Sequence, residues 1–476
     1  MIFYHGSVIF LKLRTLFISL LAALMCAVSV CAAGVGYILQ TAEPITDEDI
    51  LVQVEPVCEA ICLYRTDDYS VVERLESCGQ LVEYSVDEPV SLLDLSQDVT
   101  RLRSMQWSHA MIGLDYARQN SLHGTGVRVA MIDSGLRPDF ASFTDATVLQ
   151  GVNYLADKES DARSDTSDSV GHGTFVAGVI ASNAVGAATE AELVPLRCFD
   201  SRTTSSSYII SAVYDAVDLY NCDVINFSLG SAADNSFLRA AVAYAYEHGV
   251  IMVAASGNLK SGEVSGGNDT LYYPAAYDEV IGVGAVNAVK TIGSFSVQNS
   301  SVFVAAPGVS VKGVSLTGSG YTTGSGTSYA VPYVVASAAL AKEADPGLTP
   351  DRFMALLRES AEDAGPAGFD NTYGYGILNT GLLLAAARGD DESLILSLCG
   401  STPYISLYQP DRGTACRALM TTYEASGRFI RSAALARSDG ALFLSNYPLA
   451  DTETAFSVFC TAEGSYSPLS PAKGYR

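Results

Sequence analysis

Between residues 127 and 344 the chain alternates short, nearly uninterrupted apolar runs with longer runs of helical periodicity. A short apolar run is typical of a strand that is buried on both faces, and longer runs with a period near 3.6 are typical of helices. This alternation predicts an α/β fold in which a mostly parallel sheet is covered by helices on both faces. The expected strands span 127–132, 193–199, 223–227, 250–255, 280–286 and 302–305, and the expected helices span 207–220, 236–248 and 329–344.

Polar residues follow several of these strands at their carboxyl ends, where open parallel sheets hold their active sites. Asp133 and Ser228 come directly after two of the expected strands, and Asn258 lies shortly past a third. Because the carboxyl ends of parallel strands meet at one edge of the sheet, we expect these three side chains to lie near one another.

Two further polar residues begin apolar helices behind glycines. His172 is the only one of the five histidines that lies between two glycines, and Ser328 ends the glycine-rich stretch 324–327. Each has an ordinary structural explanation, as a helix start or an N-cap. A nucleophilic serine, however, needs a base, a carboxylate that orients the base and donors for an oxyanion. Together with Asp133, these residues supply the types that such chemistry requires.

The segment 157–168, between the first expected strand and His172, is rich in acidic residues. It is interpreted as a solvated surface loop. The alternative is a site for a cation or for basic residues of a substrate.

Composition excludes several classes of function. The 476 residues are 49% hydrophobic and 17% charged, which indicates folded domains with large cores and excludes an extensively disordered protein. The net charge of −24 argues against nucleic acid as a partner and against attraction to anionic lipid.

The N-terminus has the pattern of a segment that is exported or inserted into a membrane. Lys12 and Arg14 precede an uncharged run from 15 to 39, with small residues at 31–33. This pattern predicts a secretory signal peptide or a retained signal anchor within residues 1–40. Either alternative places the rest of the chain outside the cytoplasm, as an extracellular or cell-surface protein.

Two smaller modules flank the alternating region. Residues 43–105 are expected to form an α+β module, with strands at 50–54 and 81–86 and a helix at 70–77. Residues 390–476 carry short alternating runs separated by turns, which predict a small β-sandwich-like module.

Three segments carry a specific resemblance to a known family. Segments 129–135, 171–174 and 326–332 read VAMIDSG, GHGT and GTSYAVP. In sequence and in their Asp, His, Ser order they resemble the signature segments of the subtilisin-like serine peptidases, the subtilases of peptidase family S8. Four shorter segments resemble the family's substrate-binding strand, oxyanion segment and connecting turns: 226–230, 255–258, 273–276 and 305–308. The resemblance covers residues 106–388 and implies a subtilisin-like catalytic domain.

The resemblance also implies roles for individual residues. Ser328 is expected to attack the scissile carbonyl, His172 to act as the base and Asp133 to orient it, and Asn258 is expected to hold the oxyanion. The segment of Ser228, Leu229 and Gly230 is expected to bind the substrate as an added strand, with side-chain pockets built around it and around 255–258.

The function implied is that of a bacterial serine endopeptidase, secreted or surface-anchored, which cleaves polypeptide substrates. The alternative is a catalytically inactive binding or scaffold protein on the same fold. An esterase of the α/β-hydrolase kind is excluded because Ala330 stands where its nucleophile elbow needs glycine.

Departures from the family pattern limit what is carried over. The segment 181–190 is short where many bacterial subtilisins carry a calcium-binding loop, so no metal or other cofactor is expected, with calcium the one candidate. Phe175 stands where many relatives have a second histidine. Residues 43–105 occupy the place of a propeptide that assists folding and blocks the active site, so the chain's own propeptide is an expected partner, with a cut between Asp94 and Gln106.

The ten cysteines do not form a zinc-binding pattern. Cys198 and Cys222 lie in or beside expected core strands and are interpreted as buried thiols. Cys399 or Cys416 is a candidate for a disulfide with Cys460, and the spacing leaves the pairing open.

Overall fold

The structure is a computed structural model that divides the chain into two compact units, residues 1–91 and 92–476, which are described separately. The described residues are 36–41, 44–51, 53–58, 63–66, 68–87, 107–157, 160–259, 270–316, 320–389, 393–399, 402–408, 416–424, 429–437, 442–444, 455–462 and 473–475. The predicted signal segment therefore lies almost wholly outside them, as does the proposed cut between Asp94 and Gln106.

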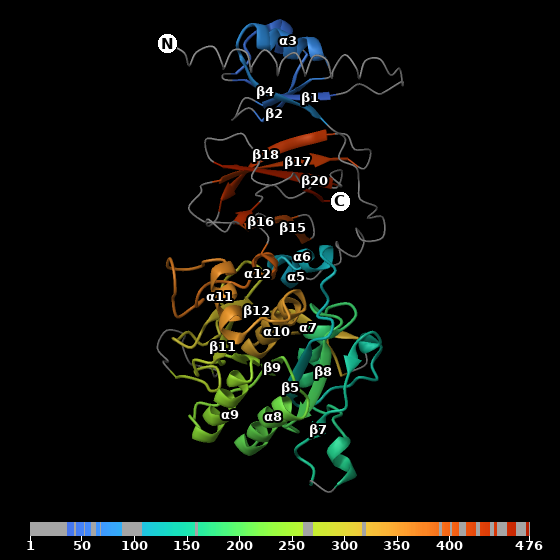
Figure 1. The fold of residues 1–476 in the computed structure, drawn as a ribbon, viewed down its shortest axis with the longest axis vertical. Coiled ribbons are helices and arrows are strands. Elements are labelled where there is room, and N and C mark those ends of the chain that lie inside the picture. Colours follow the sequence, from blue (N-terminus) through green and yellow to red (C-terminus); the bar gives the residue numbers. More distant parts are fainter. Residues whose placement is uncertain are drawn as a thin grey trace. The chain divides into compact units, whose positions relative to one another are not determined.

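A parallel sheet forms the centre of the second unit, as the sequence predicted (Figure 1). Its strand order is β12-β11-β10-β9-β5-β8-β6, with β7 paired to β8, and every one of these pairs is parallel. The strands are β5 (Arg128–Asp133), β6 (Thr147–Val148), β7 (Val152–Asn153), β8 (Glu192–Arg197), β9 (Val224–Phe227), β10 (Ile251–Ala255), β11 (Val280–Val286) and β12 (Val304–Pro307).

Helices cover both faces of this sheet. Successive residues of a strand point to opposite faces, and because both sets of side chains are apolar here, each face packs against helices. Val129 and Met131 of β5 face the helices α7 (His172–Ala181) and α10 (Thr327–Ala344), whereas Ala130 and Ile132 face α8 (Ser206–Asp218) and α9 (Ser236–Glu247). The remaining helices of this region are α5 (Trp107–Met111), α6 (Asp115–Gln119), η2 (Ala141–Phe143), η3 (Asp161–Ser164), α11 (Pro350–Ser360) and α12 (Thr380–Arg388).

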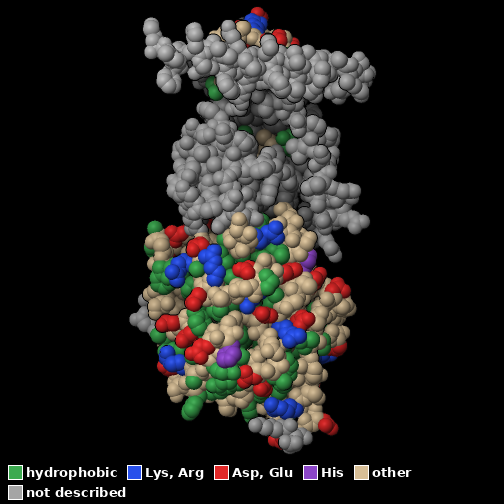
Figure 2. All heavy atoms as spheres, in the orientation of Figure 1, with side chains coloured by type: hydrophobic (Ala, Val, Ile, Leu, Met, Phe, Trp, Pro, Cys, Tyr) green, Lys and Arg blue, Asp and Glu red, His purple; other side chains and the backbone are tan. Residues whose placement is uncertain are grey.

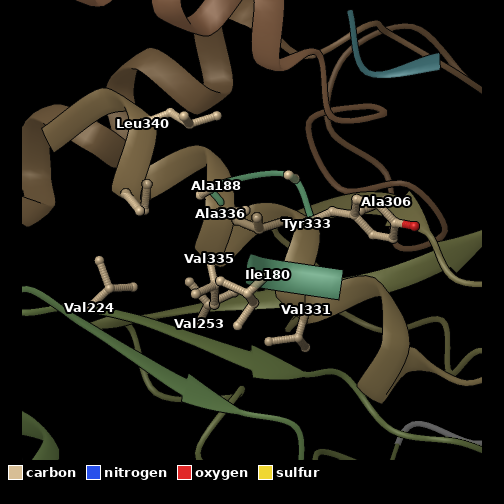
Figure 3. Packing of buried hydrophobic residues seen from close by; sticks show 14 of the residues in the cluster. Ile180, Ala188, Val224, Val253, Ala306, Val331, Tyr333, Val335, Ala336 and Leu340 are labelled. Carbon is tan, nitrogen blue, oxygen red and sulfur yellow. The ribbon is translucent and has the colours of Figure 1, made fainter. Parts of the chain in front are cut away.

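The apolar helix α10 runs through the larger of the two cores. Figure 3 shows Val331 and Val335 of this helix beside Val253 of the sheet and Ile180 of α7. All of these side chains are fully buried. The N-termini of α7 and α10 lie together, because the ring of His172 in the first turn of α7 packs against that of Tyr329 in the first turn of α10. The hairpin of β13 (Val311–Val314) and β14 (Tyr321–Gly324) leads into α10.

The N-terminal unit is an α+β module with one expected element wrong. Its elements are β1 (Gly36–Thr41), α2 (Glu48–Leu51), β2 (Glu55–Cys58), β3 (Leu63–Thr66), α3 (Tyr69–Ser77) and β4 (Leu81–Asp87), and its sheet order is β2-β3-β1-β4. The run 50–54 was expected to be a strand, but α2 takes up its first two residues. An apolar run this short is ambiguous between helix and strand, and here Ile50 and Val54 are both buried in the module's core. The sheet also begins at Gly36, before the expected start at 43.

The C-terminal region contains only strands among its described residues. They are β15 (Ser393–Cys399), β16 (Thr402–Tyr408), β17 (Cys416–Tyr423), β18 (Phe429–Arg437), β19 (Leu442–Leu444), β20 (Ala455–Ala462) and β21 (Lys473–Tyr475). They pair antiparallel in the order β15-β16-β19-β18-β17-β20-β21. The side chains of Cys399, Cys416 and Cys460 lie outside what the structure describes. Cys198 and Cys222 are free, buried thiols, as expected.

Two further observations concern the charges on the surface and the helices of the described residues. On the described part of the face in Figure 2, acidic and basic side chains are interspersed. No helix within the described residues has the length and apolar character needed to cross a membrane.

Candidate active site

Asp133 and His172, two of the predicted site residues, are in direct contact through their side chains. Asp133 is the last residue of β5, and His172 is the first residue of α7. Nδ1 of His172 lies 2.8 Å from Oδ1 and 3.0 Å from Oδ2 of Asp133. A carboxylate at this position holds a proton on Nδ1 and leaves Nε2 as the basic atom. Asp133 itself is buried, and the backbone N–H of Ser134 donates to its Oδ1 at 2.7 Å.

Glycine at position 173 allows this close approach. A Cβ on Gly173 would stand 2.2 Å from the carbonyl oxygen of Gly135, a distance that real Cβ atoms do not adopt. The first turn of α7 therefore packs directly on the loop after β5. Of the two glycines that flank His172, Gly173 is therefore required because no side chain fits at this position.

A second carboxylate, that of Asp168, lies beneath the start of α7. It was expected to belong to a solvated acidic loop spanning 157–168, and for Asp168 this interpretation is wrong because its side chain is 3% exposed. Oδ1 accepts from the backbone N–H groups of Val170 and Gly171, and Oδ2 accepts from the backbone N–H and hydroxyl of Thr174. Asp168 thus satisfies N–H groups at the N-terminus of α7, where a negative charge is also favoured by the helix dipole.

Ser134 connects the two carboxylates. Its hydroxyl donates to Oδ1 of Asp168 at 2.9 Å and accepts from the backbone N–H of Gly173 at 2.9 Å. The loop after β5 and the first turn of α7 are thereby tied together on both sides of His172.

The electrostatic surroundings raise the pKa of His172 above its ordinary value of 6.5. Burial alone would lower this pKa, because it penalises the charged ring. The charge and hydrogen bond of Asp133 outweigh burial, and the charge of Asp168 adds to them. His172 is consequently a stronger base than an exposed histidine.

We expect Asp168→Asn to move the acidic limb of the kcat/KM profile to lower pH. In the role that the resemblance implies, His172 must be neutral to accept a proton, so activity should fall as the pH drops through its pKa. Removing the charge of Asp168 lowers that pKa, and the limb moves with it. The measurement is kcat/KM against pH for a small peptide substrate.

Asp165→Asn is the matched control, because Asp165 belongs to the same loop but is exposed and binds only Ser167 among the recorded side-chain hydrogen bonds. It should leave the limb in place. A limb that stays, or moves to higher pH, in Asp168→Asn would contradict the electrostatic role of Asp168.

Ser328 is the second residue of α10, whose N-cap is Gly326, so the ordinary explanation of Ser328 as an N-cap residue does not hold. Its hydroxyl donates to the carbonyl oxygen of Ser228 at 2.9 Å. In return, the hydroxyl of Ser228 donates to the carbonyl oxygen of Ser328 at 2.8 Å. That carbonyl is available because Pro332, four residues further along the helix, has no N–H to give it.

Asn258 is oriented by the residue before Ser328. Its Oδ1 accepts from the backbone N–H of Thr327 at 3.0 Å and from the Thr327 hydroxyl at 3.1 Å. Because a backbone N–H can only donate, the atom that faces it must be the amide oxygen. The Nδ2 group is therefore on the other branch of an exposed side chain, where it can donate to a bound group.

An aromatic contact links the histidine to the helix of Ser328. The ring of Tyr329 lies 5.5 Å from that of His172 and 4.1 Å from that of Phe175, between centroids. Phe175, the position at which this chain departs from the family pattern, therefore supports the neighbour of Ser328 by packing.

The segment Ser228–Gly230 follows β9, beside the segment that follows β10. Ser228 is buried, Leu229 is partly buried and Gly230 is exposed. The next residue, Ser231, forms an isolated antiparallel bridge with Tyr273, with N–H to carbonyl distances of 2.9 and 2.8 Å. The predicted site residues thus lie at or just beyond the carboxyl ends of β5, β9 and β10, or at the N-termini of α7 and α10. Within the described residues, no group of three or more His, Cys, Asp or Glu side chains is placed to hold a metal ion.

The family model for the subtilases (Peptidase_S8, Subtilase family) matches residues 124–376, which is more than half of the chain. The chain belongs to the subtilase family. It is a serine-type endopeptidase by class, with the α/β fold and mostly parallel sheet that the sequence predicted.

Named relatives of this subtilase are bacterial proteases. The minor extracellular protease Epr of Bacillus subtilis (strain 168) is 34% identical over 278 residues, which span 57% of this chain and 41% of Epr. The chain thus spans less than half the length of Epr. Subtilisin DY of Bacillus licheniformis is 35% identical over 274 residues, which span 56% of this chain and 94% of that protein.

Solved structures agree with the sequence comparison. A lanthipeptide protease is 27% identical with a TM-score of 0.52, covering 63% of this subtilase and 98% of that chain. A protease from Pseudoalteromonas arctica PAMC 21717 is 26% identical with a TM-score of 0.51, covering 60% and 98%.

Three residues around the site of this subtilase were missed from the sequence. Asp168 was placed in a solvated loop, and the capping pattern gave no warning, because the N-cap of α7 is Gly171 and Asp168 lies three residues before it. Thr327 and Tyr329 lie inside a quoted motif, but their contacts with Asn258 and His172 join distant parts of the chain and left no local signal.

Proposed function

We propose that this subtilase is a secreted or surface-anchored endopeptidase that cleaves polypeptides through an acyl-enzyme on Ser328. The observation that carries the proposal is the contact of both Asp133 oxygens with Nδ1 of His172, whose ring packs against Tyr329 in the first turn of the helix that carries Ser328. Bacterial relatives, one of them named as extracellular, support secretion.

In this proposal Oγ of Ser328 attacks the scissile carbonyl carbon, and Nε2 of His172 takes the hydroxyl proton. The same proton then passes to the leaving amine nitrogen as the C–N bond breaks. Water attacks the acyl-enzyme in the second half, with His172 first taking a proton from water and then returning it to Ser328. Asp133 holds the ring in its tautomer and offsets its charge throughout.

The hydroxyl of Ser328 must rotate away from its present hydrogen bond before it can react. It donates to the Ser228 carbonyl in the structure, so deprotonation by His172 needs a rotation of the Ser328 side chain. Catalytic hydrogen bonds are often formed only in the substrate complex, so this arrangement is compatible with the proposed role.

Two donors are proposed for the oxyanion, and both follow from local geometry. The N–H groups of the first turn of α10 have no acceptor within the helix. That of Thr327 binds Asn258 and that of Tyr329 binds the carbonyl of Gly326. The N–H of Ser328, between them, is the donor proposed to point at the oxyanion, together with Nδ2 of Asn258.

The substrate is proposed to lie as an added strand along Ser228, Leu229 and Gly230. Gly230 is exposed and has no side chain, which gives a peptide main chain room to approach. Each proton transfer in the scheme has a protein donor or acceptor, so the proposal includes no metal or other cofactor.

The alternative is an inactive binding or scaffold protein on the same fold. Hydrolysis of unfolded casein by the purified protein separates the two. The endopeptidase should release acid-soluble peptides at a rate that is lost on treatment with a serine-directed phosphonylating reagent. Casein that stays intact in the presence of protein freed of residues 1–105 would support the scaffold.

We further propose that the N-terminal module is a propeptide removed by the enzyme itself, with the cut between Asp94 and Gln106. Wild-type protein should therefore show a mature N-terminus in that interval, whereas Ser328→Ala should retain the module. The measurement is the N-terminal sequence of both purified proteins. If both begin at the same residue near 100, another protease makes the cut and self-cleavage is wrong.

A further inference from the structure

Two segments flank the space beside Ser328, and a tyrosine lies between them. Ser228–Gly230 follows β9, and 256–258 follows the neighbouring strand β10, which pairs with it in parallel. Ser228 is hydrogen-bonded to Ser328, and Asn258 is hydrogen-bonded to Thr327. A substrate residue whose carbonyl carbon is attacked by Ser328 must therefore direct its side chain near these two segments.

The ring of Tyr272 contacts the glycine of each segment. A Cβ built on Gly257 would lie 2.5 Å from Cδ2 and 2.8 Å from Cε2 of Tyr272, so the ring lies directly against the glycine backbone. A Cβ on Gly230 would lie 3.5 Å from Cβ and 3.7 Å from Cδ1 of the same tyrosine. One aromatic side chain thus spans from one segment to the other.

The backbone that carries Tyr272 is fixed on both sides. Tyr273, the next residue, exchanges two backbone hydrogen bonds with Ser231, and the carbonyl of Tyr272 accepts from the N–H of Ala276 at 2.9 Å. The ring of Tyr273 packs on that of Tyr277 at 4.9 Å. Movement of the Tyr272 ring is consequently limited to its own two side-chain torsions.

We infer that Tyr272 is a specificity-determining residue which restricts the substrate residue on the acyl side of the scissile bond to small side chains. Glycine, alanine and serine fit beside the tyrosine ring, whereas phenylalanine, tyrosine and leucine need the space that the ring takes up. This inference rests on the proposed function, because it assigns a substrate class to the same site. Forcing a large side chain against a closely packed ring is penalised steeply, so the preference should be large.

The test compares two peptide nitroanilides that differ only in the residue before the cleaved bond, alanine or phenylalanine. Wild-type protein should have the higher kcat/KM for the alanine peptide. Tyr272→Ala should raise the ratio of kcat/KM for the phenylalanine peptide to kcat/KM for the alanine peptide by about tenfold or more. Tyr272→Phe keeps the ring and is the matched control, so it should retain the wild-type preference.

A second measurement does not depend on whether the variant folds. The cleavage sites that the wild-type protein makes in casein, read by mass spectrometry, should follow small residues. Frequent cleavage after phenylalanine, tyrosine or leucine, or an unchanged preference in a folded Tyr272→Ala variant, would overturn the inference while leaving the proposed function intact. Failure to cleave either peptide or casein would instead contradict the proposed function, and this inference with it.

Discussion

Ser328→Ala should lower kcat for peptide hydrolysis by about 10⁶-fold, the size of loss known for subtilisin when its nucleophile is removed. The structure gives the physical reason. Ser328 is half-buried at the second position of α10, next to a tyrosine that packs against His172. Without its hydroxyl no acyl-enzyme forms, and the rate that remains comes from binding and oxyanion donors acting on water. Steady-state hydrolysis of a peptide nitroanilide measures the loss.

Ser207→Ala is a suitable control, because Ser207 is an exposed serine on α8 whose hydroxyl contacts only Ser205 in the recorded bonds. It should leave kcat within about threefold of wild type. The Ser328→Ala protein should also unfold at nearly the wild-type temperature, because only a partly exposed hydroxyl is lost. A folded Ser328→Ala variant that keeps more than about a hundredth of wild-type kcat would show that another group is the nucleophile.

Asn258→Ala should lower kcat by about 10²–10³-fold, which corresponds to about 2.7–4 kcal/mol of transition-state stabilisation; this figure too is that of the oxyanion asparagine of subtilisin. KM should change little, because the donor serves the oxyanion more than the ground-state carbonyl. The measurement is kcat and KM for the same nitroanilide.

Asn258→Asp separates oxyanion donation from loop support. Aspartate keeps an oxygen that can accept from the N–H and hydroxyl of Thr327, which the present Oδ1 binds. It replaces the Nδ2 donor with a carboxylate oxygen, so kcat should fall at least as far as in Asn258→Ala. If Asn258→Asp retained near-wild-type kcat, Asn258 would act by holding Thr327 in place, and its assignment as a donor would be wrong.

The sheet could be predicted because each strand has a local signature. Strands buried on both faces read as uninterrupted apolar runs, and β11 was expected at 280–286 and is observed there. The Asp133–His172 contact could be anticipated for a different reason, because the family resemblance of the two motifs implies that Asp133 orients His172. Local patterns failed where the apolar run was short, as in α2, where burial of Ile50 does not require a strand.

The remaining features of the site depend on contacts between distant residues. Asp168 was read as a loop carboxylate because its neighbours are polar, and only the fold shows that it is buried beneath α7. Tyr272 was not singled out at all. Its importance comes from Gly230 and Gly257, which are separated from it along the chain and lie against its ring only after β9 and β10 have paired.

A fluorophosphonate tests most directly whether Ser328 is a nucleophile activated by His172 and Asp133, because such a reagent forms a bond from phosphorus to an activated serine Oγ and releases fluoride. The protein freed of residues 1–105 is treated at pH 8 and digested, and the modified peptide is identified by mass spectrometry. We expect one adduct, on Ser328, that is lost in His172→Ala. Absence of an adduct, or an adduct on a different serine, would contradict the assignment of Ser328 as the nucleophile.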